Sequence, residues 1–248
     1  MDNNIIFEIF EGLPRQGPGD NRCTKQAFET IPIPKKSLKI LDIGCGSGMQ
    51  TIQLAKLCED CTITATDIYQ PYLDDLKQKS EAEDLPSGVI TECVSMENLP
   101  YDKESFDIIW SEGSVFIMGF ENGITYWKDF LKTGGYLCLT EAAWFLDNPS
   151  KEAELFWNEA YPLIKTIDGN IEIIKKCGYE IVDTFRLPES AWTDNYYTPV
   201  INHINKIRDD YRGNDEALNL IKEIEKEAEI YQKHHNDYGY VFFVLKKI

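Results

Sequence analysis

The chain has 248 residues, 43% of them hydrophobic and 27% charged, and its formal net charge is −17 at pH 7. This length and composition allow a sizeable buried core and fit one α/β domain with a modest insertion. The negative charge argues against a nucleic acid as the main partner and against an anionic membrane surface, because phosphate groups would be repelled across most of the protein.

The first residues, MDNNIIFEIFEG, carry acidic side chains where a secretory signal would need a basic start and a long apolar run. No apolar run approaches the roughly 20 residues that span a bilayer. The seven cysteines are odd in number and scattered, which predicts reduced thiols and a cytoplasmic location. Cys58 and Cys61 form a C-x-x-C pair without a second pair, so we expect them to pack rather than to bind metal or to carry out redox chemistry.

Residues 1–36 precede the first predicted strand. Asn3–Phe10 and Asn21–Ile31 are apolar enough for two short helices. The segment LPRQGPGDN, Leu13–Asn21, is rich in Pro and Gly and is therefore predicted to be a loop.

The stretch Ser37–Thr51, SLKILDIGCGSGMQT, predicts a buried strand, a tight turn and the start of a helix. Such a unit brings backbone close to a bound molecule and directs helix N–H groups toward it. The glycines stand at Gly44, Gly46 and Gly48, whereas a dinucleotide fingerprint would place its third glycine at Met49.

Two acidic residues follow predicted strands in this region. Asp42 lies two residues before the first glycine, where its carboxylate would repel pyrophosphate but would suit a ligand with a positive ammonium or sulfonium group. Asp67 closes the next apolar run, TITATD, where an acid can accept hydrogen bonds from both ribose hydroxyls of an adenosine.

Beyond the glycine cluster, apolar segments of strand and helix length alternate. The predicted elements are, in order, a helix at Gln50–Cys58, a strand at Thr62–Thr66, a helix at Pro71–Ala82, strands at Gly88–Val94 and Phe106–Trp110, a helix at Ile124–Leu131, a strand at Tyr136–Thr140 and one or two helices within Pro149–Cys177. Strands separated by helices of this length predict a parallel sheet with right-handed crossovers.

LDIGCGSG followed by TATDI resembles motif I and the ribose-binding strand end of class I S-adenosylmethionine-dependent methyltransferases, of the methyltransferase type 11-like small-molecule kind. SMENLPY, FDIIWSEGS and LKTGGYLCLTE resemble later parts of this fold, so the likeness covers Ser37–Glu141. It implies an α/β, Rossmann-like, seven-stranded, mostly parallel sheet flanked by helices. Cys177–Leu187 would be the sixth strand, and Tyr238–Lys247 an antiparallel last strand between the fifth and sixth.

The resemblance also implies an activity and a cofactor. The protein would transfer a methyl group from S-adenosyl-L-methionine to a small-molecule acceptor and release S-adenosylhomocysteine. Two alternatives stay open: a module that binds the cofactor without catalysis, and an NAD(P)-dependent oxidoreductase, against which Met49 and Asp42 argue.

The cofactor site implied by the resemblance lies at the strand ends. Ser95 stands where the family often has Asp, and Met96 would lie against the adenine or pack in the core. If the segment before the first strand folds over the cofactor as a lid, Arg15 and Gln16 could meet the methionine carboxylate or the substrate; otherwise it is a solvated linker. The predicted cofactor-binding residues are Asp42, Gly44, Cys45, Gly46, Gln50, Asp67, Ile68, Ser95, Met96, Glu97, Ser111 and Arg15.

Glu112 is the predicted catalytic residue and a substrate contact, because it follows the fourth strand at the open end of the sheet, where ligands gather. It could take a proton from the acceptor or anchor a cationic substrate, or it could be a surface carboxylate that caps a turn. Trp144, Tyr196 and Tyr197 are predicted substrate contacts through their aromatic faces, with core packing as the alternative.

The methyltransferase domain is expected to span 37–248, with a helical cap insertion at about 188–237. Apolar residues recur at helical spacing in the second half of this insertion. A cap of this kind fits either enclosure of a substrate or formation of a homodimer. No cluster has metal-ligand spacing, so no metal is expected.

Overall fold

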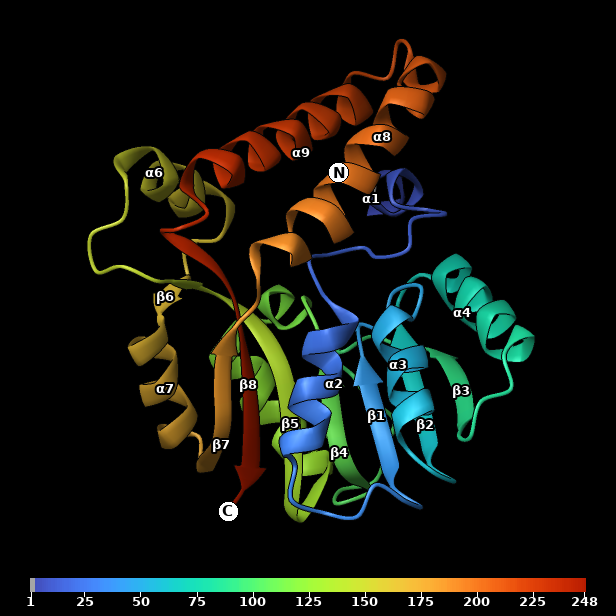
Figure 1. Cartoon of the computed structure of the whole chain (residues 1–248). Helices are drawn as coiled ribbons and strands as arrows, with labels where there is room; N and C mark the ends of the chain where they lie inside the picture. Colours follow the sequence, from blue (N-terminus) through green and yellow to red (C-terminus); the bar gives the residue numbers. More distant parts are fainter. Residues whose placement is uncertain (1–2) are drawn as a thin grey trace.

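The computed structural model describes residues 3–248; Met1 and Asp2, with which the predicted N-terminal lid segment begins, lie outside the described residues. The sheet has eight strands in the order β3-β2-β1-β4-β5-β8-β7, with short β6 paired to β5 (Figure 1). The strands are β1 Lys39–Ile43, β2 Thr62–Asp67, β3 Gly88–Cys93, β4 Phe106–Ser111, β5 Leu131–Trp144, β6 Lys165–Thr166, β7 Tyr179–Arg186 and β8 Tyr238–Lys247.

Nine α-helices lie in the described residues, together with short 3-10 and π segments. The α-helices are α1 Asn3–Ile9, α2 Asn21–Thr30, α3 Met49–Leu57, α4 Gln70–Ala82, α5 Phe120–Trp127, α6 Lys151–Ala160, α7 Ile167–Lys176, α8 Thr198–Ile207 and α9 Asp215–His234. The short segments are η1 Val115–Ile117, η2 Lys128–Phe130, η3 Glu189–Ala191, the π-helix η4 Thr193–Tyr197 and η5 Arg208–Tyr211.

The strand directions agree with the predicted fold class. β1 to β6 pair in parallel, whereas β8 is antiparallel to both of its neighbours, β5 and β7. The chain leaves β1 toward β2 on one side and reaches β4 on the other, so the strand order reverses between β1 and β4. Ligands of open α/β sheets bind outside the carboxyl ends of the strands at such a reversal.

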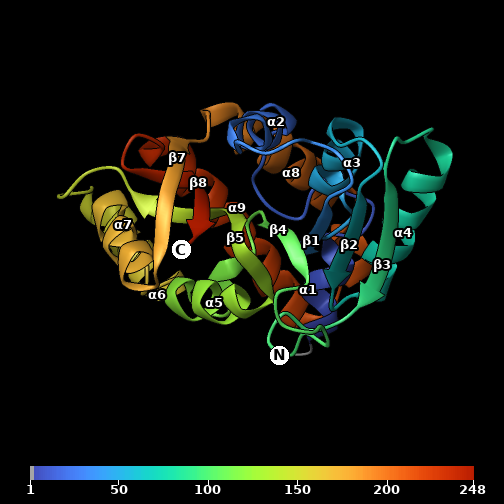
Figure 2. The ribbon, with the colours of Figure 1, turned by 90° about the horizontal axis from the view of Figure 1, so that it is seen from below.

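Helices cover both faces of the sheet, α2 and α3 on one and α5 and α7 on the other (Figure 2). Alternate residues of β1 point to opposite faces, as in any strand. Ile40 packs in the cluster that contains Phe28 of α2, whereas Leu41 packs in the cluster that contains Trp127 of α5. The apolar run of β1 is therefore explained by burial on both sides.

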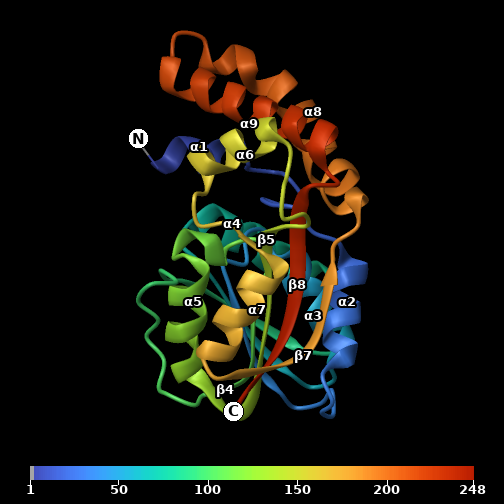
Figure 3. The same cartoon turned by 90° about the vertical axis from the view of Figure 1, so that its left-hand side faces the viewer.

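The segment between β7 and β8 forms a helical layer above the carboxyl ends of the strands (Figures 1 and 3). Its longest helix, α9, begins at a side-chain cap, where Asn214 Oδ1 accepts a hydrogen bond from Ala217 N at 3.1 Å. The helix buries an apolar stripe that includes Ile221, Ile224 and Tyr231. This layer lies within the segment 188–237, for which the sequence predicts a helical insertion, and its role as a cap stays a prediction.

Two predicted elements differ from the structure. The helix predicted at 124–131 begins and ends four residues earlier, as α5, and η2 then leads directly into β5. The strand predicted at 136–140 extends to Trp144, because β8 continues to pair with it as far as Trp144 opposite Tyr238. Local apolar patterns do not show how far a distant strand will extend a ladder.

The expectation for Cys58 and Cys61 was wrong. The two residues form a disulfide between the end of α3 and the start of β2, and the remaining five cysteines are free thiols. The odd number and scatter of cysteines describe the chain as a whole and say nothing about one local pair. Among the helices of residues 3–248, none has the length and apolar character required to cross a membrane.

Candidate active site

The glycine turn after β1 is built on left-handed backbone and is bound to the end of β2. Gly44 and Gly46 have φ of 68° and 53°, a region that side chains other than glycine rarely adopt. The N–H groups of Gly44 and Cys45 donate to the carbonyl of Thr66 at 2.8 and 3.0 Å. Gly46 N donates to Asp67 Oδ2 at 2.9 Å. The turn and the β2 carboxylate are thus one rigid unit.

Asp42 stabilises this unit through contacts with the first turn of α3. Its side chain is fully buried, and Oδ2 accepts a hydrogen bond from Thr51 Oγ1 at 2.6 Å, while Gln50 Nε2 approaches Oδ1 at 3.5 Å. Burial raises the pKa of Asp42 to about 7, and these hydrogen bonds oppose the shift. The carboxylate therefore fastens the first turn of α3 to β1 and does not line the cavity described below.

An N-terminal strap, residues 13–19, lies across the glycine turn. Ser47 N donates to Gln16 Oε1 at 2.7 Å, and Ser47 Oγ donates to the carbonyl of Leu13 at 3.2 Å. Gln16 Nε2 also donates to the carbonyl of Leu13, at 3.2 Å. These contacts fasten the strap to the turn, and its role as a lid stays a prediction.

The residues before the strap contact both the start of α4 and the helical layer above the sheet. The ring of Phe7 stacks on Tyr69 at a centroid distance of 4.8 Å, and Tyr72 Oη donates to the carbonyl of Phe7 at 2.9 Å. Phe10 stacks on Tyr196 of the cap at 6.1 Å. The N-terminal segment therefore bridges the start of α4 and the cap.

Glu112 follows β4 and is held in a fixed position. Its side chain is only 3% exposed. Oε1 accepts hydrogen bonds from Thr24 Oγ1 at 2.6 Å and from Trp110 Nε1 at 2.9 Å. Oε2 lies 3.6 Å from Arg15 Nη1 and has no hydrogen-bond partner among the described residues. One oxygen anchors the carboxylate, and the other faces the Arg15 guanidinium without a hydrogen bond.

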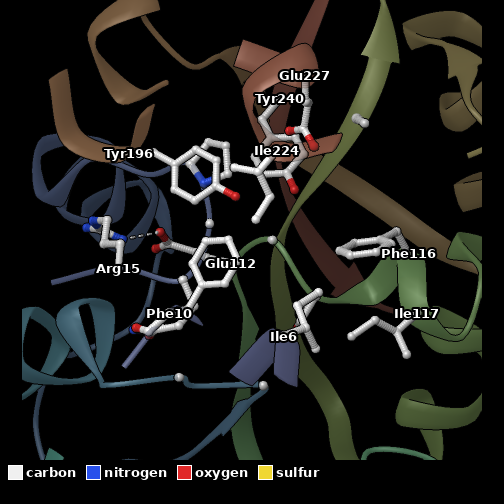
Figure 4. A pocket seen from close by; sticks show the side chains of 18 of the residues that line it. Ile6, Phe10, Arg15, Glu112, Phe116, Ile117, Tyr196, Ile224, Glu227 and Tyr240 are labelled. Atoms are coloured by element: carbon white, nitrogen blue, oxygen red, sulfur yellow. Dashed lines mark hydrogen bonds and ion pairs between the residues drawn. The ribbon is translucent and has the colours of Figure 1, made fainter. Parts of the chain in front are cut away.

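A cavity of about 660 Å³ joins the glycine turn to the interior of the cap (Figure 4). A volume of this size is in the range of known small-molecule sites. The predicted site residues that line it are Arg15, Gly44, Cys45, Gly46, Gln50, Asp67, Ile68, Met96, Glu112 and Tyr196. The structure thus brings together residues that are up to 181 positions apart, from Arg15 to Tyr196.

The other predicted cofactor residues do not line the cavity. The buried Ser111 hydroxyl lies 2.7 Å from the hydroxyl of Ser114, which does line it. Ser95 accepts a hydrogen bond from Glu97 N at 3.3 Å in the loop after β3, and Glu97 is exposed. These side chains shape the loops around the cavity.

Two predicted substrate contacts also lie outside the lining. Trp144 packs edge-on against Tyr238, with ring centroids 5.8 Å apart. Tyr197 donates its hydroxyl proton to Glu227 Oε1 at 2.9 Å. Tyr197 therefore reaches the cavity only through Glu227, which does line it.

Sequence reasoning missed Glu227 of α9 and Tyr240 of β8, both of which line the cavity. A signal for Glu227 was present, because it lies three residues after Ile224 and four before Tyr231 and so falls on the apolar stripe of the helix. A carboxylate on such a stripe requires a polar partner or a ligand. Tyr240 lies in the apolar strand β8, and the sequence around it does not indicate a functional role.

Three features are typical of the class I S-adenosylmethionine-dependent methyltransferase fold: the strand order, the antiparallel pairing of β8 with β5 and β7, and the glycine turn after β1. Residues 40–135 match the family described as "Methyltransferase domain". The resemblance found in the sequence is thereby confirmed: residues 40–135 are similar to a methyltransferase domain.

Among curated proteins, the chain is 26% identical over 189 residues to 2-methyl-6-phytyl-1,4-hydroquinone methyltransferase 1, chloroplastic, of Oryza sativa subsp. japonica, a match covering 72% of this chain and 52% of that protein. It is 30% identical over 97 residues to 27-O-demethylrifamycin SV methyltransferase of Amycolatopsis mediterranei, covering 39% of this chain and 35% of that protein. The chain thus spans about half or less of the length of these relatives.

A crystal structure of a SAM-dependent methyltransferase from Geobacter sulfurreducens in complex with S-adenosyl-L-homocysteine matches with a TM-score of 0.80. The match has 16% sequence identity and covers 99% of this chain and 98% of that one. At this identity the likeness concerns the fold, including the helices above the sheet.

Proposed function

We propose that this protein transfers a methyl group from S-adenosyl-L-methionine to a small-molecule acceptor and releases S-adenosylhomocysteine. The observation that carries the proposal is the continuous cavity, which runs from Asp67 at the end of β2 past Gly44 to Tyr196 in the cap. Residues of the strap and of the cap contribute to its lining, so both would contact a donor and an acceptor bound there. The small-molecule methyltransferases among the relatives support the same class of acceptor.

The residues present fit the cofactor. Asp67 accepts backbone hydrogen bonds from Gly46 at 2.9 Å and from Tyr69 at 3.0 Å, and its carboxylate, which lines the cavity, has further lone pairs for ribose hydroxyls. The lack of a side chain at Gly44 leaves the space beside Ser114 and Met96 open. Arg15, Gln50 and Ile68 would complete the contacts.

When bound, the cofactor supplies a methyl carbon that its sulfonium has already activated, so the protein mainly orients, encloses and handles protons. Glu112 is anchored through Oε1, which leaves Oε2 to accept a proton or a hydrogen bond from the acceptor. Phe10 and Tyr196 close the space above it and exclude water.

The turn is poorly suited to a dinucleotide. A pyrophosphate would need free N–H groups at the glycine turn. Those of Gly44, Cys45 and Gly46 already donate to Thr66 and Asp67. In addition, the side chain of Met49 stands where the fingerprint requires glycine.

Calorimetric titration of the full chain with S-adenosylmethionine, S-adenosylhomocysteine and NADH, after removal of any co-purified ligand, tests the proposal. We expect micromolar binding of the first two and none of NADH, followed by formation of S-adenosylhomocysteine with a suitable acceptor. Binding of NADH alone would overturn the proposal. Cofactor binding without turnover across a broad set of small molecules would favour the non-catalytic module.

A cytoplasmic location and a homodimer stay predictions from the sequence. Cell fractionation tests the location, and size-exclusion chromatography with light scattering tests the oligomeric state.

A further inference from the structure

The cap end of the cavity contains a carboxylate without a cationic partner. Glu227 of α9 lines the cavity and is half-buried. Its Oε1 accepts the hydrogen bond from Tyr197 Oη at 2.9 Å, and the side chain forms no ion pair within residues 3–248. Burial raises the pKa of Glu227, and the Tyr197 hydrogen bond opposes that shift. A negative charge at this position therefore lacks compensation in the empty cavity.

Aromatic rings with unused hydroxyls surround this carboxylate. Tyr196 and Tyr240 line the cavity and are 7% and 8% exposed. Neither hydroxyl donates or accepts a hydrogen bond in the part of the chain that the structure describes. Trp192 closes the wall behind them, with its ring centroid 4.7 Å from that of Tyr240. Figure 4 shows Tyr196, Tyr240 and Glu227 gathered around the same space.

The chain's own cations do not neutralise Glu227. Arg15 lies 3.6 Å from Glu112 and donates to Asn21 Oδ1 at 2.5 Å. Lys226 is exposed, and its Nζ lies 5.7 Å from the centre of the Phe156 ring. Lys226 also lines the cavity, but no basic side chain within residues 3–248 forms an ion pair with Glu227. A carboxylate of this kind next to aromatic faces suits an ammonium group, which gains both ionic and cation–π attraction.

The wall on the other side of the cavity is apolar and reaches solvent. Ile6, Phe116 and Ile117 line the cavity, yet they are 41%, 43% and 59% exposed. Figure 4 places them together and away from Glu227. A ligand that fills the whole space therefore needs an apolar part against this wall as well as a polar head.

We propose that the acceptor is an amphiphilic organic amine, whose ammonium group binds Glu227, Tyr196 and Tyr240 and whose apolar body lies against Ile6, Phe116 and Ile117. This inference rests on the proposed function and names the substrate class for the same cavity. Because an ammonium nitrogen has no free electron pair, Glu227 acts in recognition. The atom that receives the methyl group is a second nucleophile of the same molecule.

The test uses calorimetry to compare the binding of two probes, 4-phenylbutylamine and 4-phenylbutan-1-ol. Both are titrated into the full chain after it has been saturated with S-adenosylhomocysteine. The two probes share the apolar body and differ only in the head group. We expect the amine to bind at least about tenfold more tightly, as for a hydrogen bond to a charged group. This comparison uses the unaltered protein and so does not depend on a variant that folds.

Glu227→Gln keeps an oxygen that can accept the Tyr197 hydrogen bond and removes only the charge. It should abolish the preference for the amine and leave the affinity for S-adenosylhomocysteine unchanged. Glu229→Gln, an exposed position on the same helix, is the matched control and should retain the preference.

Equal binding of the two probes, or binding of neither to the cofactor-loaded protein, would overturn the inference while leaving the proposed function intact. An amine preference that persists in Glu227→Gln would also overturn it. Failure of S-adenosylhomocysteine itself to bind would instead refute the proposed function.

Discussion

Asp67 is the carboxylate whose removal should weaken cofactor binding most directly. In the structure it accepts backbone hydrogen bonds from Gly46 and Tyr69, and it lines the cavity beside Ile68. A ribose bound there would donate to a charged acceptor, and such hydrogen bonds contribute about 1.5–3 kcal/mol. For Asp67→Ala we expect a loss of about 2 kcal/mol, or roughly 30-fold weaker binding of S-adenosylhomocysteine.

Calorimetry at constant pH and salt measures this loss. Asp67→Asn keeps one of the two oxygens that accept from Gly46 N and Tyr69 N, so it should lose less affinity than Asp67→Ala. Asp74→Asn removes a carboxylate of α4 that bonds only Gln70 at the surface, and its affinity should stay within about twofold of the original protein. Equal affinities of the original protein and Asp67→Ala would refute the placement of a ribose at the end of β2.

Three further changes test other parts of the site. Glu112→Gln should slow methyl transfer by about 100-fold with nearly unchanged cofactor affinity; a normal rate would reduce Glu112 to a structural role. Gly46→Ala places a side chain at φ 53° and against Gln16, so it should lower the free energy of unfolding by about 1–2 kcal/mol. Gly88 has open space around it, so the control Gly88→Ala should change the free energy of unfolding little. Burial raises the pKa of Glu141 from 4.5 to about 8, so the unfolded chain ionises first and stability should fall as pH rises through this interval. Urea denaturation at both ends of the interval should show a smaller fall for Glu141→Gln, and an equal fall would contradict the assignment.

The sheet and the part of the cavity at the strand ends were predictable because local sequence determines them. The apolar run of β1, the glycines that follow and the acid at the end of β2 are contiguous segments, and their spacing fixes a strand, a turn and an anchoring point. Asp67 and Gly44 accordingly line the cavity.

The cap end of the cavity was not predictable in the same way, because it is assembled from distant segments whose local patterns are ordinary. Glu227 belongs to a charged helix, Tyr240 to an apolar strand and Phe10 to the turn after a short helix, and only the tertiary fold brings them to one cavity. Asp42 shows the converse: its position in the motif suggests a ligand contact, but it is buried and bonded to Thr51. A sequence pattern shows where a residue lies in a strand or helix, but it does not show which group its carboxylate will contact.

The charge arrangement of the cavity also bears on the order of events in a catalytic cycle. Asp67, Glu112 and Glu227 line it, and Arg15 is the one buried cation of the described lining. Carboxylates that face a shared low-dielectric space repel one another, a cost that a positively charged ligand offsets. The sulfonium of the substrate form of the cofactor carries such a charge, whereas the thioether of its product does not. Under the proposed function, these carboxylates would favour the methyl donor over the spent cofactor, and transfer of the methyl group would itself weaken the hold on the product.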